Sequence, residues 1–122
     1  MKQREYALRA KRFEATEKAR KVALLEAMIR DFDGMAADLS RQIAAEEERT
    51  GVKDPGHFAY STFAKAAAQR RSNLQTSVGD LREKLDAARK EHDEALAELG
   101  KLEPADDRER LLRKSDPRVM AG

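Results

Sequence analysis

The sequence predicts an all-α protein: a long two-helix antiparallel coiled-coil hairpin with a short C-terminal extension. Charged residues make up 39% of the 122 residues and aromatic residues only 5%, a composition too polar for a compact globular core. Apolar residues recur in alternating steps of three and four, which is typical of coiled coils. Before residue 100, turn-forming residues cluster only within residues 50–60, so the chain is expected to reverse direction there.

The first helix is predicted over about residues 4–49 from the spacing of its apolar residues. Lys11 and Lys18 interrupt this seam with polar side chains. A 3.5-residue period sustained over such a length predicts a left-handed supercoil. The apolar seam positions of this helix are Leu8, Ala15, Val22, Leu25, Ile29, Phe32, Ala36, Leu39 and Ile43.

A loop is predicted over residues 50–60. Gly51 stands where a left-handed residue can end a helix, and Asp54-Pro55-Gly56 is typical of a tight turn. Either Ser61 or Thr62 can accept a hydrogen bond from a first-turn amide, so a second helix is expected to begin near this point.

The second helix is predicted over about residues 61–103, with Arg71 and His92 as polar interruptions of its seam. Facing residues of an antiparallel hairpin have numbers that add to a constant, and a sum of 110 pairs the two seams. In this register Lys18 faces His92. The apolar seam positions of the second helix are Ala64, Ala67, Leu74, Val78, Leu81, Leu85, Ala88, Ala95, Leu99 and Leu102.

The hairpin domain is expected to cover residues 1–103, and residues 104–122 are expected to form a short helix and a loose tail. Pro104 lacks an amide donor and clashes with the preceding turn, so the seam is predicted to end or kink there. A short helix is predicted over residues 105–114, stopped by Ser115-Asp116-Pro117.

Charge is distributed unevenly along the chain. Residues 1–25 hold eight bases and three acids, whereas residues 26–50 hold three bases and seven acids. Folding back at the loop therefore brings unlike charges together. At the N-terminal end, Arg9 and Arg12 are predicted to approach Lys101 and Glu98. Two further bases extend past the seam without fixed partners and are candidate docking residues: Lys2 and Arg4.

Nothing in the sequence favours catalysis. The sequence has two histidines and no cysteine, so it offers few residues from which a catalytic nucleophile and its base could be built. His92 is predicted to be a polar seam residue, and the acidic run at residues 46–48 is predicted to be a solvated face. No Gly-rich phosphate loop occurs. We therefore expect no enzymatic activity, cofactor, metal or small-molecule substrate.

Candidate partner-binding residues gather in and after the loop, because exposed aromatic side chains suit protein recognition. They are His57, Phe58, Tyr60 and Phe63. For His57 a solvated turn residue is the alternative, and for Phe58 and Tyr60 the alternative is local packing that holds the turn. Four apolar residues off the seam either broaden the core or contact a partner: Leu24, Met28, Met35 and Leu96.

Part of the sequence resembles a known family. The stretch 46–74 contains His57-Phe58-Ala59-Tyr60 and then an Ala-rich segment with Arg70-Arg71. Together with Ala10-Lys11-Arg12-Phe13 and residues 32–39, it resembles the flagellar export protein family FliJ of alphaproteobacterial type. The likeness covers roughly residues 1–102, and the loop is its specific part, since heptads are common to all coiled coils.

The resemblance implies a non-enzymatic, soluble component of the flagellar type III protein export apparatus. Such a protein is a coiled-coil stalk or adaptor that contacts the export ATPase ring at one end and the membrane export gate protein at the other, and handles export chaperones. It implies a role in bacterial flagellum biogenesis, motility and chemotaxis. The expected location is cytoplasmic, peripherally associated with the inner face of the cell membrane at the flagellar base.

Two other binding functions compete with this one. A generic coiled-coil scaffold could self-associate in parallel, but the charged seam residues Lys11, Lys18 and Arg71, as well as His92, would then each meet their own copy. A nucleic-acid-binding arm could use the basic N-terminal segment, but its charges are predicted to be matched by residues 80–103. No nucleic-acid partner is therefore expected.

Overall fold

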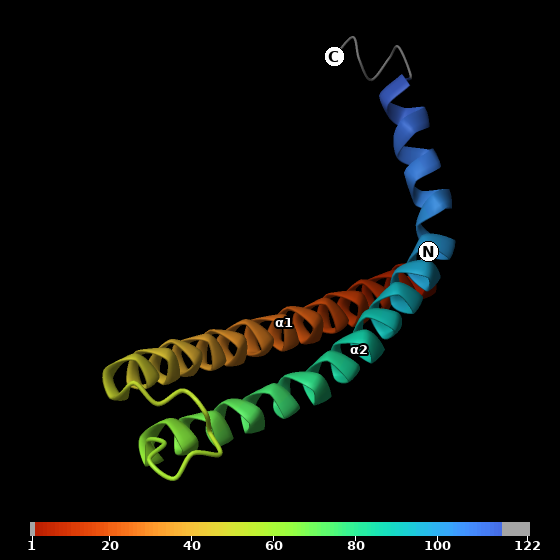
Figure 1. The fold of residues 1–122 in the computed structure, drawn as a ribbon. Coiled ribbons are helices and arrows are strands. Elements are labelled where there is room, and N and C mark those ends of the chain that lie inside the picture. The colour runs from red at the N-terminus through yellow and green to blue at the C-terminus, as the bar shows by residue number, and fades with distance from the viewer. Residues whose placement is uncertain (1, 116–122) are drawn as a thin grey trace. The chain divides into compact units, whose positions relative to one another are not determined.

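The computed structural model describes residues 2–115, with side chains described up to Glu103. It contains two long helices, α1 (Lys2–Thr50) and α2 (Thr62–Ser115), and residues 2–115 hold no strand. The two helices pack against each other as a helical hairpin, so the predicted all-α class is confirmed (Figure 1).

The chain divides into two compact units, which are described separately. The loop unit comprises residues 23–86 and the terminal unit residues 1–22 with 87–122. Within each unit, a stretch of α1 packs against a stretch of α2 that runs in the opposite direction (Figure 1).

The core consists of small and aliphatic side chains at the predicted seam positions. Every buried hydrophobic residue of the described chain lies at such a position, and none of the buried residues is polar or charged. The remaining apolar seam residues are half-buried: Val22, Ile29, Phe32, Leu74, Leu99 and Leu102. The buried residues are Leu8, Ala15, Leu25, Ala36, Leu39, Ile43, Ala64, Ala67, Val78, Leu81, Leu85, Ala88 and Ala95.

Cross-helix contacts agree with the predicted register. In the terminal unit, Lys18 bonds to Glu91 at 3.0 Å, and Lys11 pairs with Glu98. The numbers add to 109 in both pairs, one less than the predicted sum. In the loop unit, Arg71 Nη1 donates to Ser40 Oγ at 3.1 Å, where the sum is 111. Three of the four polar seam residues, Lys11, Lys18 and Arg71, thus have a partner on the neighbouring helix.

The end of α1 follows the prediction for Gly51. Its φ of +75° places it in the left-handed region, and its amide donates to the Glu47 carbonyl at 2.9 Å. This bond satisfies one of the carbonyl groups that the helix end leaves free. The predicted turn follows, with the His57 amide donating to the Asp54 carbonyl at 3.0 Å and the Gly56 amide to Asp54 Oδ1 at 2.9 Å.

The start of α2 is capped by Ser61, one of the two residues that the sequence offered for this role. Ser61 Oγ accepts a hydrogen bond from the Ala64 amide at 3.2 Å, and the Ser61 carbonyl accepts one from the Lys65 amide at 3.0 Å. Both bonds are typical of a helix N-cap. The loop therefore spans residues 51–61, one residue later than predicted at each end.

The expected end of the second helix near residue 103 differs from the structure. α2 continues through Pro104 to Ser115, so residues 105–114 are not a separate short helix. A proline inside a helix removes one amide donor and bends the backbone, but strong helix formers on both sides can maintain the helix. The predicted loose tail at residues 118–122 lies outside the described residues.

Candidate partner-binding surfaces

The most exposed aromatic residue lies in the loop. Phe58 is 96% exposed, and its ring stacks on the imidazole of His57 with the centroids 4.6 Å apart and an interplanar angle of 24°. His57 is itself exposed, and its Nδ1 accepts a hydrogen bond from the Ala59 amide at 3.0 Å. The loop backbone thus holds the imidazole in place, and the imidazole supports one face of the phenyl ring.

Tyr60 has a different environment from Phe58. It is half-buried and packs against the core cluster of Leu39, Ile43, Ala64 and Ala67. Its hydroxyl donates to Glu47 Oε2 at 2.9 Å. Burial, and then the hydrogen bond to Glu47, raise the pKa of the Tyr60 hydroxyl. Tyr60 therefore attaches the loop to α1, in agreement with the packing alternative for this residue.

The predicted solvated face at residues 46–48 is wrong for two of its three members. Glu46 and Glu47 are half-buried and accept hydrogen bonds from Ser61 and Tyr60, at 3.1 and 2.9 Å. A bond from Arg49 and a second from Ser61 lower the pKa of Glu46, against the effect of burial. Of these three residues only Glu48 is exposed, and its Oε2 lies 3.6 Å from Lys53 Nζ. Glu46 and Glu47 bind the loop because they lie near the end of α1, where their carboxylates are close to Tyr60 and Ser61.

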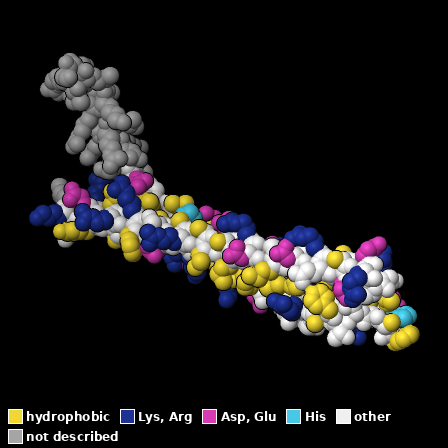
Figure 2. All heavy atoms as spheres, turned by 90° about the vertical axis from the view of Figure 1, so that its left-hand side faces the viewer, with side chains coloured by type: hydrophobic (Ala, Val, Ile, Leu, Met, Phe, Trp, Pro, Cys, Tyr) yellow, Lys and Arg dark blue, Asp and Glu magenta, His cyan; other side chains and the backbone are white. Residues whose placement is uncertain are grey.

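The four candidate loop residues thus form two sets. Phe63 is exposed in the first turn of α2, and with His57 and Phe58 it makes up the exposed set. Tyr60 is the packed residue. Partner binding stays a prediction for all four, and only the exposed set presents most of its ring surface to solvent. On the face drawn in Figure 2, hydrophobic side chains remain exposed between basic and acidic ones.

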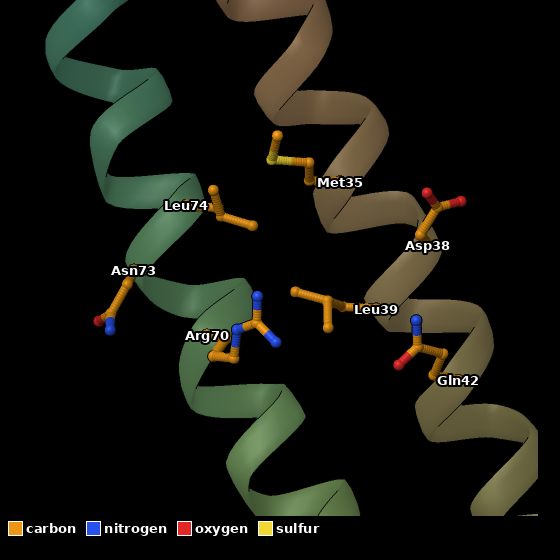
Figure 3. Close-up of a pocket in the computed structure, with 7 residues that line it drawn as sticks. All are labelled: Met35, Asp38, Leu39, Gln42, Arg70, Asn73 and Leu74. Atoms are coloured by element: carbon orange, nitrogen blue, oxygen red, sulfur yellow. The ribbon is translucent and has the colours of Figure 1, made fainter.

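A groove that the sequence did not reveal lies between the helices of the loop unit. Its volume is about 420 Å³, within the range of ligand-binding clefts. In Figure 3, Leu39 of α1 and Leu74 of α2 point toward each other across it. Met35, an off-seam residue, is 50% exposed at its edge. The full lining is Met35, Asp38, Leu39, Gln42, Arg70, Asn73 and Leu74.

The two rims of the groove differ in whether their charged side chain forms an ion pair. On α1, Asp38 forms an ion pair with Arg41 of the same helix and points away from the groove (Figure 3). On α2, Arg70 reaches toward the groove and makes no ion pair with any residue whose side chain is described. The signal that could have located this groove was the off-seam Met35, which lies one position before the seam residue Ala36.

The basic N-terminal end belongs to the terminal unit. Lys2 and Arg4 are exposed and make no ion pair with any side chain in the described part of the chain. The hydrogen bonds at this end involve partners other than the expected pair of Arg12 and Glu98. Lys11 forms an ion pair with Glu98, and Arg12 Nε donates a hydrogen bond to Glu103 Oε1 at 3.2 Å. Both bases of α1 thus reach carboxylates of α2.

The cross-helix ion pairs change the acidity of their carboxyl groups. The hydrogen bond from Lys18, followed by the charges of Lys18 and Lys21, lowers the pKa of Glu91. Lys11 lowers the pKa of Glu98 in the same way, and Glu98 in turn raises the pKa of Lys11. These groups are largely exposed, so water and salt screen their attraction.

The off-seam apolar residues do not broaden the core. Leu24, Met28, Met35 and Leu96 are all exposed. Within residues 2–103, no group of three or more His, Asp or Glu side chains is placed to hold a metal ion. Neither α1 nor α2 has, within its described residues, an apolar stretch long enough to cross a membrane.

Comparisons with known proteins give no match to this chain among family models, curated proteins or solved structures.

Proposed function

We propose that this chain is a coiled-coil adaptor of the flagellar type III protein export apparatus, without enzymatic activity of its own. In this role it links the export ATPase ring, the membrane export gate protein and export chaperones at the inner face of the cell membrane. The sequence resemblance supplies the identity of these partners. The observation that carries the proposal is a hairpin in which the basic seam residues Lys11, Lys18 and Arg71 have their partners within one chain.

Lys11, Lys18 and Arg71 are the residues that decide between an adaptor and a parallel self-associating scaffold. Each has a partner on the neighbouring helix, Glu98, Glu91 and Ser40 respectively. In a parallel homodimer each of these bases would face its own copy, which is unfavourable for like charges. The intrachain pairs therefore favour a hairpin that is complete by itself and free to bind other proteins.

The exposed surfaces also suit an adaptor. In the loop unit, His57, Phe58 and Phe63 present aromatic surface, and a separate groove lies between the helices. In the terminal unit, Lys2 and Arg4 present positive charge. Aromatic anchors and unpaired charges are the features from which protein interfaces gain affinity and association rate.

The test is association and stimulation with purified proteins. The full chain is mixed with the export ATPase, the cytoplasmic part of the gate protein and export chaperones, and binding and ATP hydrolysis are measured. We expect the chain to bind the ATPase and raise its turnover while hydrolysing no ATP alone. A chain that binds none of these proteins, or that elutes only as a parallel dimer, would refute the adaptor role in favour of the scaffold.

A further inference from the structure

The groove of the loop unit contains an arginine without a partner. Arg70 reaches toward the groove (Figure 3), and it forms no ion pair or hydrogen bond with any residue whose side chain is described. Arg71, the next residue, donates to Ser40 Oγ at 3.1 Å. On the opposite rim, Asp38 is paired with Arg41 and points away from the groove (Figure 3). The charge that remains available at the groove is therefore positive.

This positive charge has no acidic neighbour along α2. Residues 62–79 contain the bases Lys65, Arg70 and Arg71 and no acidic residue. A guanidinium that is covered without a counter-charge loses hydration and gains nothing in return. A molecule that covers the groove therefore has to bring a negative group to Arg70.

The groove is apolar below this charge. Leu39 is buried and Leu74 half-buried, and the two side chains point toward each other (Figure 3). Met35 at the edge is 50% exposed, and Met28, seven residues earlier, is 36% exposed. At ~100° per residue, seven residues return to within about 20° of the same direction, so the two methionines share one flank of α1. Exposed apolar surface thus continues from the groove along α1.

A large apolar residue also stands on the other side of Arg70. Phe63 is 55% exposed and lies seven residues before Arg70, so both share one flank of α2. Phe63 follows Ser61, which bonds Glu46 near the end of α1. The surface from Met28 to Phe63 therefore extends along about eighteen residues of α1, or roughly 27 Å. Apolar groups lie at both of its ends and the free guanidinium lies between them.

We propose that this groove binds an amphipathic helix of an acidic partner protein. Its apolar side chains cover Met35 and Phe63, and a carboxylate between them pairs with Arg70. A helix of about eighteen residues matches the length of the surface. Recognition of this kind, in which the apolar face of a helix enters a groove between two others, is common among helical proteins.

A helix fits this surface better than a small molecule or a membrane does. A small carboxylate could fill the groove, about 420 Å³ in volume, but would leave Met28 and Phe63 exposed. A membrane surface requires a broad apolar face, whereas Leu39 and Leu74 lie between two helices. The inference defines the partner by its chemistry and does not rest on the proposed function.

The experiment uses two synthetic helical peptides of about eighteen residues. Both carry leucines in alternating steps of three and four, and the row contains one glutamate in the first peptide and one lysine in the second. Binding to the full chain is measured by fluorescence anisotropy. We expect the glutamate peptide to bind at least about tenfold more tightly, because the lysine peptide meets a like charge. Arg70→Glu should reverse this preference.

Matched variants separate the groove from the rest of the chain. Lys65→Glu makes the same charge change as Arg70→Glu at an exposed position about 140° around α2, and it should keep the preference for the glutamate peptide. Met35→Ala should weaken binding of the glutamate peptide. Leu96→Ala removes an exposed apolar side chain from the terminal unit and should leave binding unchanged. Circular dichroism should show the same helix content for all variants.

Three results would overturn the proposal. The first is equal affinity for the two peptides, or a preference that Arg70→Glu does not alter. The second is light scattering that shows a dimer of the unaltered chain which Met35→Ala or Arg70→Glu dissociates, because a second copy would then occupy the groove. The third is binding of decanoate that depends on Arg70 while neither peptide binds. The export proteins take no part in these measurements, so this proposal and the export function fail separately.

Discussion

Lys18 and Glu91 contact each other across the two helices of the terminal unit, with Lys18 Nζ 3.0 Å from Glu91 Oε2. Lys18 occupies a seam position, where the pattern otherwise places apolar side chains. Its long side chain covers the seam while the ammonium group reaches a carboxylate at the edge, where both groups keep contact with water. A polar interruption of the seam is thus accommodated within one chain.

Cross-linking tests the antiparallel pairing within one chain. Ala36 is buried and Leu74 half-buried in the loop unit, and the two face each other in the predicted register. Because the native chain has no cysteine, Ala36→Cys with Leu74→Cys should form one disulfide, within the monomer, at low protein concentration. The control Ala37→Cys with Leu74→Cys places one thiol on the exposed side of α1 and should cross-link poorly. Mainly intermolecular bridges would contradict the hairpin.

Adjacent leucines test the assignment of the seam. Leu25 is buried, whereas Leu24 is 62% exposed. Leu25→Ala should destabilise the protein by ~2–5 kcal/mol, as large-to-small changes in a core do. Leu24→Ala removes the same atoms from a surface position and should change stability by less than about 0.5 kcal/mol. Thermal and urea unfolding followed by circular dichroism give both values, and equal effects would show that the seam is misassigned.

The loop aromatics test the division into exposed and packed residues. Phe58→Ala should leave the melting temperature nearly unchanged, because its ring makes little contact beyond His57, yet it should weaken binding to the gate protein or chaperones and reduce motility. Tyr60→Phe removes the hydroxyl that bonds Glu47 and should lower the melting temperature without changing helix content. A large loss of stability in Phe58→Ala would show that the ring packs locally to hold the turn and would contradict a binding role.

Acid should destabilise the terminal unit. The pKa values of Glu91 and Glu98 lie below their ordinary value of 4.5 in the folded chain. Their ion pairs therefore stabilise the fold fully above about pH 4.5, and this stabilisation is lost as the pH falls through the lowered pKa values. We expect the melting temperature to fall below this pH. Glu91→Gln/Glu98→Gln should melt lower at pH 7 and show a smaller further fall in acid.

The control for this titration is Glu83→Gln, because Glu83 is exposed and forms no ion pair within residues 2–103. It should keep the acid dependence of the unaltered chain. An identical pH profile for the double variant and the unaltered chain would show that the two cross-helix pairs do not contribute to stability.

Charge reversal tests the basic end. Lys2→Glu with Arg4→Glu should leave the hairpin folded, because both side chains are exposed. It should slow association with the ATPase ring and reduce the salt dependence of the rate, as expected when attraction between unlike charges is removed. Lys84→Glu with Lys90→Glu makes the same net charge change at exposed positions of α2 and should have little effect. Equal association rates at low ionic strength would show that the basic end is only a solvated terminus.

The seam and the ends of the loop could be predicted because each depends on the types and spacing of residues that are close together in the sequence. Step spacing identified every buried residue, from Leu8 to Ala95. Gly51 and Ser61 were recognisable because few residue types tolerate a left-handed φ or cap a helix. Pro104 misled the prediction, since proline weakens a helix at one position while the residues that follow decide whether it continues.

Side-chain pairing was less predictable than the fold. Glu98 lies within reach of both Lys11 and Arg12 by sequence position, and only the direction of each side chain from the helix surface assigns it to Lys11. The role of Glu46 and Glu47 depended on how the loop returns, which the sequence pattern does not specify. The groove beside Met35 is lined mostly by exposed residues around Leu39 and Leu74, and a list of seam positions contains no such information.

The anchoring of Tyr60 to Glu47 and of Ser61 to Glu46 has a consequence for how the loop would bind. A loop that must become ordered on binding spends part of its interaction energy on lost conformational freedom. Here the His57 amide already donates to the Asp54 carbonyl before Phe58, Tyr60 and Ser61 attach the loop to α1 after it, and His57 supports its ring. A partner that covers Phe58 would therefore meet a preorganised surface, and its affinity would depend on the ring itself more than on the folding of the loop around it.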